Sequence, residues 1–240
     1  MMDRTPPPAA PTPLVADELD LLRSLLPLAG ARVADLGCGD AQMSRRLVAR
    51  GLVGSVAALE VDARQHAKNL AAAPLAGLDF VLAGADEIPF PDASFDIALM
   101  FKSLHHVPGE RLDSAMAEIA RVLAPGGLLY VSEPVFAGAF NEIVRLFHDE
   151  EAVRAAALAA LRRAGSAGLL EPVDERHFDA PLAFRDFGDF LDRIVRVTHT
   201  DHSLAAGTLA EVRRRFEAHL GEDGARFVRP MRANLLRRPA

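Results

Sequence analysis

The sequence predicts an α/β fold with a doubly wound, mainly parallel sheet. Between residues 30 and 134, short apolar runs typical of strands alternate with amphipathic segments typical of helices. The run from Ile97 to Phe101 is continuously apolar, as expected of a strand that is covered on both faces. Half of the 240 residues are apolar, which is enough for one hydrophobic core.

The alternating part of the chain gives most of the expected elements. A first helix is predicted over residues 14–28, ending near Gly30. Strands are predicted over residues 32–36, 55–60, 78–83, 95–101 and 128–132. Helices are predicted between them over residues 41–50, 63–72 and 110–123. The sequence Pro125-Gly126-Gly127 is expected to end the last helix and to lead into the fifth strand.

The alternation lapses after Pro134. The pattern predicts a short strand over residues 177–181, a closing strand over 226–236, and helices over residues 140–147, 151–163, 187–195 and 204–220. These elements divide the chain into a flexible Pro-rich N-terminus and a single domain. The expected boundaries are 1–13 for the N-terminus and 14–240 for the domain, with a binding core over 30–134, a helical substrate cover over 135–225 and the closing strand over 226–236.

The composition indicates which kinds of binding partner to expect. Residues 1–134 hold 17 acidic side chains against 11 Lys and Arg, so the binding half disfavours a phosphate backbone and no nucleic acid is expected. No apolar run approaches the roughly 20 residues that span a bilayer, and we expect no membrane partner and a cytoplasmic location. The single cysteine, Cys38, forms no internal disulfide. The oligomeric state stays open.

A glycine-containing turn follows the first predicted strand. Gly37 and Gly39 allow backbone N–H groups to approach a ligand where a side chain would collide. Position 42, where a dinucleotide site has its third glycine, holds Gln42. Asp35 would repel a pyrophosphate and attract a cation such as the ammonium of an amino acid.

The order Asp35-Leu36-Gly37-Cys38-Gly39 resembles the first motif of class I S-adenosylmethionine-dependent methyltransferases, specifically their small-molecule branch called type 11. The segments 83–96, 101–108 and 124–134 resemble later motifs of the same family in the same order, so the resemblance covers about residues 30–134. It implies a seven-strand-type sheet, S-adenosylmethionine as cofactor, and methyl transfer to an O, N or C nucleophile of a small molecule.

The resemblance also implies where the cofactor lies. In relatives an Asp commonly stands where Gly84 stands here, so we expect Asp86 or the backbone of Ala85 to contact the adenine. Glu60 aligns with the acid that binds the ribose hydroxyls, and the backbone at Lys102 with the segment beside the methionine part. The full expected set is Asp35, Gly37, Cys38, Gly39, Glu60, Val61, Ala85, Asp86 and Lys102.

Two adjacent histidines are the candidate catalytic residues. His105 and His106 belong to the Leu-His-His segment of the resemblance, and His106 suits a general base because an unperturbed imidazole is half ionised near pH 6.5. A role in shaping the pocket is the alternative, since methyl transfer from a sulfonium can proceed by positioning alone. No metal site is expected: His199 and His202 beside Asp201 are too few ligands, and a capping or surface role is favoured.

The acceptor is expected to be a small, partly apolar metabolite. The fourth strand is not followed by the Asn/Asp-Pro-Pro-aromatic element that methyltransferases acting on DNA bases and protein glutamine use. The segments 14–28 and 136–147 are expected to wall the pocket, with apolar surface from Phe136, Phe140, Phe147 and Phe184. Two alternatives stay open, a non-catalytic cofactor-binding module and, disfavoured by Gln42, a nicotinamide-dependent oxidoreductase.

Overall fold

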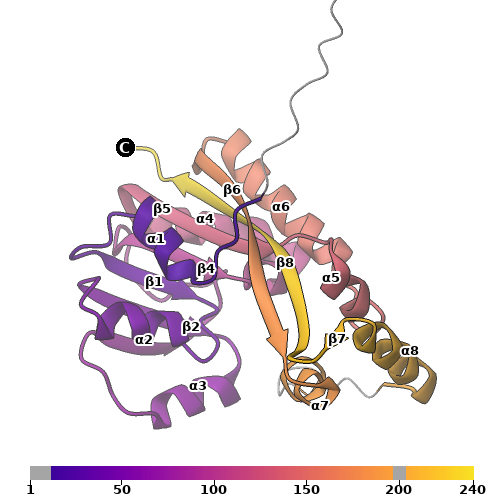
Figure 1. Cartoon of the computed structure of the whole chain (residues 1–240). Coiled ribbons are helices and arrows are strands. Elements are labelled where there is room, and N and C mark those ends of the chain that lie inside the picture. The colour runs from indigo at the N-terminus through magenta and orange to yellow at the C-terminus, as the bar shows by residue number, and fades with distance from the viewer. Residues whose placement is uncertain (1–11, 197–203) are drawn as a thin grey trace, which may run out of the picture.

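An eight-stranded sheet forms the centre of the protein in a computed structural model that describes residues 12–196 and 204–240 (Figure 1). Seven strands follow in the order β3-β2-β1-β4-β5-β8-β6, and β7 pairs with β8. Pairing is parallel from β3 to β5, whereas β8 runs antiparallel to β5 and β6. The doubly wound, mainly parallel sheet predicted from the sequence is thus confirmed. The strands are β1 (Arg32–Leu36), β2 (Ser55–Glu60), β3 (Leu78–Leu82), β4 (Phe95–Phe101), β5 (Leu123–Pro134), β6 (Glu171–Phe184), β7 (Leu220–Gly221) and β8 (Gly224–Arg237).

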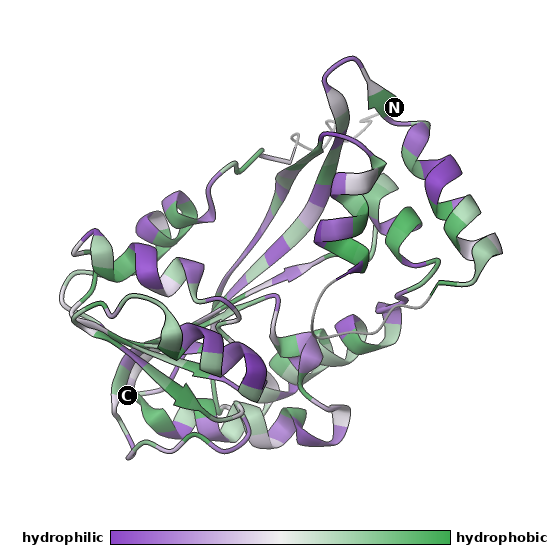
Figure 2. Cartoon of the chain, turned by 90° about the horizontal axis from the view of Figure 1, so that it is seen from below, coloured by the Kyte–Doolittle hydropathy of each residue, from purple (hydrophilic) through white to green (hydrophobic). Residues whose placement is uncertain are grey.

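Helices connect the strands and pack on the faces of the sheet. They are α1 (Glu18–Leu25), α2 (Gln42–Ala49), α3 (Ala63–Ala71), η1 (Leu104–His106), η2 (Gly109–Arg111), α4 (Leu112–Val122), α5 (Ala139–Val144), α6 (Glu151–Ser166), α7 (Phe187–Phe190), η3 (Leu191–Val195) and α8 (Ala206–Glu217). Figure 2 shows hydrophilic and hydrophobic residues side by side on these helices, as expected where one face packs on a sheet and the other meets water. Within the described residues, none of these helices has the length and apolar character needed to cross a membrane.

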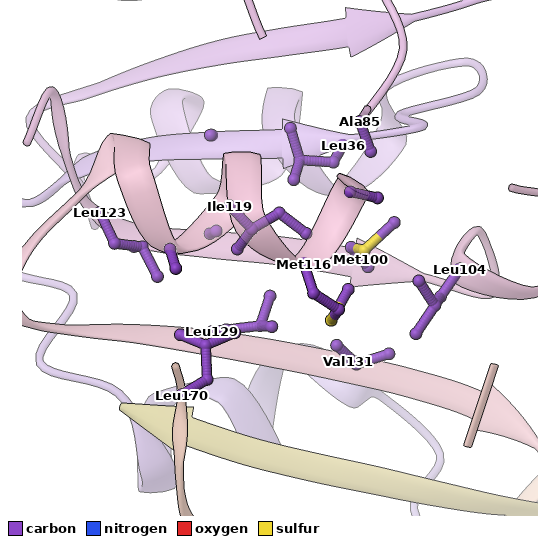
Figure 3. Close-up of a cluster of buried hydrophobic side chains, with 14 of the residues drawn as sticks. Leu36, Ala85, Met100, Leu104, Met116, Ile119, Leu123, Leu129, Val131 and Leu170 are labelled. Atoms are coloured by element: carbon purple, nitrogen blue, oxygen red, sulfur yellow. The ribbon is translucent and has the colours of Figure 1, made fainter. Parts of the chain in front are cut away.

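The sheet has a separate apolar layer on each face. On one face α1 and α2 cover strand residues such as Val33 and Ile97, and Leu19 and Leu22 of α1 are fully buried there. On the other face α4 and α6 pack on the alternate residues of the same strands, as Figure 3 shows for Met116 and Ile119 of α4. Strands covered on both faces must be apolar throughout, which explains the continuous run in β4.

The N-terminal helix is shorter than predicted. Instead of residues 14–28 it spans Glu18–Leu25, because the Asp17 carboxylate accepts a hydrogen bond from the N–H of Leu19 and so caps the helix there. The segment before it is extended and pairs with β6, where the N–H of Val15 donates to the carbonyl of Asp179. This pairing covers part of the edge that β6 exposes.

Strand β6 is much longer than the predicted strand over residues 177–181. It spans 14 residues of the expected helical cover, and it pairs with β8 along almost its whole length. An edge strand is exposed on one side, so charged residues and prolines interrupt the apolar alternation from which we predicted strands. Figure 1 shows the long β6–β8 pair reaching from the sheet to α7 and β7.

Candidate functional site

A cavity of about 860 Å³ opens at the carboxyl ends of β1, β2 and β4. In a doubly wound sheet this is the edge where ligands bind, and the volume is in the range of small-molecule sites. All nine residues expected to hold a cofactor line this cavity, although they come from four separate segments of the chain. His106 lines it as well, whereas His105 does not.

The glycine turn after β1 is held in place by backbone hydrogen bonds. The N–H groups of Gly37 and Cys38 both donate to the carbonyl of Leu59 at the end of β2. A Cβ on Gly37 would lie 2.7 Å from the Cβ of Ser103, so this glycine makes room for the neighbouring loop. A Cβ on Gly39 would meet nothing within 4 Å and would enter the open space of the cavity. The two glycines therefore serve different steric purposes.

The carboxylate of Asp35 is buried at the floor of the cavity, with only 2% of the residue exposed. Its Oδ2 accepts a hydrogen bond of 2.5 Å from the Ser44 hydroxyl, while its Oδ1 has no hydrogen-bond partner. Burial raises the pKa of Asp35 to about 6, and the bond from Ser44 opposes this rise. Cys38 is close to this carboxylate, and burial raises the pKa of its thiol, as suits an unreactive side chain.

Two further carboxylates lie along the cavity. Glu60 accepts the N–H of Gly39 on Oε2 at 2.8 Å and the N–H of Asp62 on Oε1 at 2.9 Å. Each carboxylate oxygen can accept two hydrogen bonds, so capacity remains for ligand hydroxyls. Asp86 extends over Gly84: its Oδ1 lies 2.5 Å from the position that a Cβ on Gly84 would take. The Asp86 carboxylate therefore occupies the space of a side chain at position 84, and its Oδ2 pairs with Arg111 at 3.1 Å.

Lys102 marks the far end of the cavity, after β4. Its φ of 54° lies in the left-handed region, which is costly for a residue with a side chain. The backbone N–H of Lys102 donates to the carbonyl of Ser132 at 2.7 Å, which holds this conformation. Burial lowers the pKa of the Lys102 amine, and the charge of Glu18 partly offsets that effect. Glu18 itself lines the cavity and accepts a hydrogen bond of 2.9 Å from Tyr130.

The adjacent histidines occupy different environments. His105 is 5% exposed, and its two ring nitrogens face Glu133 on one side and Glu150 on the other. Burial disfavours the charged ring, but the hydrogen bonds with both glutamates outweigh burial and raise the pKa of His105 to about 9. His106 is exposed toward the cavity, and its ring centroid lies 4.1 Å from that of His105.

The phenylalanines expected to line the acceptor pocket lie elsewhere. Phe140 and Phe184 are buried, with ring centroids 6.0 Å apart, in a third apolar cluster formed with Phe187, Phe190, Phe216 and Phe227. Phe147 packs against this cluster, and Phe136 stacks with Arg145. None of these side chains lines the cavity, so the expectation of an aromatic pocket wall is wrong. The spacing of apolar residues predicts that a side chain is buried. It does not show whether that side chain lines the cavity or packs in a separate apolar cluster.

Sequence reasoning missed several residues that the fold brings to the site. Glu133 ends β5 and Glu150 precedes α6, and their contacts with His105 cross 28 and 45 positions of the chain. Glu18, Arg111 and His148 also line the cavity. Local pattern carries no signal for such long-range pairs. The expected histidine pair His199 and His202 with Asp201 lies outside the described residues.

Comparison with known proteins assigns the fold and the motifs to a family. Residues 34–131 match the family described as methyltransferase domain. This part of the chain is similar to class I methyltransferase domains. It is 36% identical over 119 residues to the 27-O-demethylrifamycin SV methyltransferase of Amycolatopsis mediterranei, and 33% identical over 128 residues to the O-methyltransferase rstn1 of Aspergillus nomiae. These matches cover 48% and 50% of this chain and 43% and 55% of the relatives, so the chain matches about half of their length.

The likeness in fold to a solved structure extends over nearly the whole chain. The crystal structure of YcgJ from Bacillus subtilis superposes with a TM-score of 0.67 at 18% identity and covers 92% of this chain and 97% of that one. The family implies S-adenosylmethionine, and the site of this methyltransferase domain fits that group. The buried, unpartnered Oδ1 of Asp35 suits an ammonium, and the open space above Gly39 admits a ligand against the backbone.

Proposed function

We propose that this protein transfers the methyl group of S-adenosylmethionine to an O, N or C nucleophile of a small molecule. The observation that carries the proposal is the cavity at the carboxyl edge of the sheet. It unites the nine expected cofactor residues with one exposed imidazole. Asp35 would bind the ammonium of the cofactor, Glu60 would bind its ribose hydroxyls and Asp86 would contact its adenine. The backbone of the glycine turn would lie beside the cofactor.

The reaction needs an electrophilic methyl group and a positioned nucleophile. The bound cofactor supplies a methyl group on a positively charged sulfur, and the cavity wall from Lys102 to His106 would hold the acceptor in line with it. The nucleophile would take the methyl group as its bond to sulfur breaks, and the His106 imidazole would take the proton that the nucleophile loses. His105, held between two glutamates, would fix the position of the loop that carries His106.

A small-molecule acceptor agrees with the charge of the site and with the names of the relatives. One relative acts on demethylrifamycin SV and another is an O-methyltransferase, so we propose an oxygen nucleophile first. Asp35, Glu60 and Asp86 surround the cofactor end with negative charge, which would repel a phosphate backbone.

Cofactor titration followed by labelling tests this function. In calorimetry we expect binding of S-adenosylmethionine and S-adenosylhomocysteine and none of NAD⁺; binding of NAD⁺ alone would favour an oxidoreductase. Methyl-labelled cofactor is then incubated with a small-metabolite extract, total RNA and denatured protein. Labelling should appear in the extract. Labelling of RNA or protein alone would exclude the small-molecule acceptor, and cofactor binding without any transfer would favour a non-catalytic module.

The role of His106 has its own test. His106→Ala should lower turnover about a hundredfold or more, the usual scale for the loss of a general base, with unchanged affinity for S-adenosylhomocysteine. His177→Ala, which changes an exposed imidazole on β6, is the matched control and should retain full turnover. If His106→Ala raises KM for the acceptor and leaves kcat intact, the side chain shapes the pocket and is not the base.

A further inference from the structure

A cluster of metal-ligating side chains borders the acceptor end of the cavity. His105, His106 and Glu150 each offer a donor atom, and these atoms all lie within 4.8 Å of one another. The Nε2 of His105 is 3.4 Å from the Oε1 of Glu150. Among the described residues no other group of three or more His, Cys, Asp or Glu side chains converges in this way.

The two buried ligands, His105 and Glu150, each form a hydrogen bond that fixes the orientation of the side chain. The Nδ1 of His105 is hydrogen-bonded to Glu133, whose other oxygen accepts the N–H of Leu104 at 2.9 Å. The Oε2 of Glu150 accepts a 2.5 Å hydrogen bond from Arg154, and Oε1 lies between the Nε2 atoms of His148, at 2.8 Å, and His105, at 3.4 Å. Metal-binding histidines almost always have such a carboxylate or carbonyl on the second ring nitrogen, since it fixes the ring and the tautomer.

The spacing of one donor pair fits a common ion, and the third donor lies within 4.8 Å of both. Two ligands that are each about 2.1 Å from a common ion lie about 3.0–3.4 Å apart in octahedral or tetrahedral geometry. The His105–Glu150 pair already has the spacing of such ligands. Two imidazoles and one carboxylate form a three-donor set that suits Fe²⁺, Co²⁺ or Zn²⁺ and leaves coordination positions open. Those positions would face the cavity, because His106 lines it.

We propose that His105, His106 and Glu150 bind one divalent transition-metal ion at the acceptor end of the cavity. When the ion binds, the Nε2 of His105 gives its proton to solvent and forms the bond to the metal. The ion then supplies the positive charge that balances Glu133 and Glu150, two carboxylates that are both largely buried. The Nε2 of the nearby His148 is 2.8 Å from the Oε1 of Glu150, the same oxygen that faces His105.

The ion would also affect the proposed methyl transfer. This effect rests on the proposed function, whereas the metal site itself does not. In the metal-bound form His106 is a ligand, so the ion takes over the activation of the acceptor that the metal-free site assigns to that imidazole. An acceptor hydroxyl bound to the ion would lose its proton more readily than in water.

Metal titration of the chelator-treated protein tests the site without methyl donor or acceptor. Co²⁺ is added and followed by visible absorption, and Zn²⁺ by calorimetry. We expect one ion per chain, and at least about a hundredfold weaker binding for Glu150→Gln and for His105→Gln. Glu133→Gln, which changes only the group behind His105, should weaken binding about 10- to 100-fold. His177→Gln is the matched control on the surface and should bind as the wild type does.

Folding is checked for each variant by circular dichroism and by affinity for S-adenosylhomocysteine. The proposal fails if the wild type binds no stoichiometric ion, or if Glu150→Gln and His105→Gln, folded by these criteria, bind it as tightly as the wild type. Since the titration contains no methyl donor, its outcome is independent of whether the protein transfers a methyl group.

Discussion

At the scale of single residues, Asp35 combines a cost to folding with its proposed role in binding. Its carboxylate has lost most of its water, yet Oδ1 has gained no partner from the chain. A buried, incompletely bonded carboxylate is unfavourable in the ligand-free protein. The cost is compensated when a cationic group enters the cavity, so the same burial that destabilises the site strengthens its attraction for a cation.

The pKa of Asp35 leads to a pH-dependent affinity. Because burial raises this pKa to about 6, the carboxylate is ionised above pH 6 and neutral below it. Affinity for S-adenosylmethionine should therefore be full above about pH 7 and fall as the pH decreases through 6, by up to about tenfold per pH unit. Calorimetric titrations between pH 5 and 8 measure it. In Asp35→Asn the affinity should be lower and independent of pH in this range, and an equally steep decline in that variant would assign the effect to another group.

Substitution of the two glycines of the turn should lower stability and cofactor binding to different extents. Both have positive φ, 72° for Gly37 and 55° for Gly39, so an alanine at either position has a backbone cost of about 1–2 kcal/mol. Only at Gly37 does the new Cβ also collide with Ser103. Gly37→Ala should thus lower the free energy of unfolding clearly more than Gly39→Ala in urea denaturation, and Gly39→Val should abolish cofactor binding in a protein that still folds. Equal destabilisation by the two alanines would show that the contact with Ser103 is relaxed at no cost.

At the scale of elements, the sequence and the structure agree best where strands are buried on both faces. The strands β1, β2 and β4 have the bounds that the sequence predicted. Agreement is worst at β6, an edge strand whose pairing with β8 is decided by tertiary contact and not by its own pattern. The same contrast holds for the site. The motif residues that follow β1 and β2 could be predicted from the local sequence, whereas Glu133 and Glu150 contact His105 only because the folded chain brings them together.

The long β6–β8 pair carries its own small core, formed by the phenylalanine cluster with Phe184 and Phe227 on the two strands. Rings from α5, α7 and α8 pack on them, with centroids of Phe184 and Phe190 5.4 Å apart. Phe184→Ala removes a fully buried ring and should destabilise the protein by about 3–5 kcal/mol. Because the cluster does not line the cavity, affinity for S-adenosylhomocysteine at a temperature where the variant is folded should stay within about twofold of the wild type.

Stability is measured by denaturant unfolding and affinity by calorimetry on the same samples. The matched control is Phe80→Ala, a half-exposed ring on β3 that packs against Arg45, which should have a smaller effect on stability. A Phe184→Ala protein with wild-type stability but weakened ligand binding would contradict the assignment of this ring to a structural core.

At the scale of the whole molecule, the cavity joins segments that follow four different strands: the glycine turn after β1, Glu60 at the end of β2, Asp86 after β3 and Lys102 after β4. A ligand that fills this cavity would contact all four strand ends at once. Binding to the folded state alone stabilises that state, by about 2.7 kcal/mol when the ligand is present at 100 times its Kd. For a domain of this size that corresponds to a rise in Tm of about 5–10 °C.

We therefore expect S-adenosylmethionine and S-adenosylhomocysteine at 100 times their Kd to raise the melting temperature by this amount in differential scanning fluorimetry. NAD⁺ at the same concentration should leave it unchanged, because Asp35 repels a pyrophosphate and Gln42 stands where its third glycine would be needed. In Asp35→Ala the rise at the concentration that saturates the wild type should largely disappear, since the ammonium would lose its buried counter-charge on the cavity floor. An equal rise with NAD⁺, or a full rise in Asp35→Ala, would show that the ligand is held by contacts other than those assigned here.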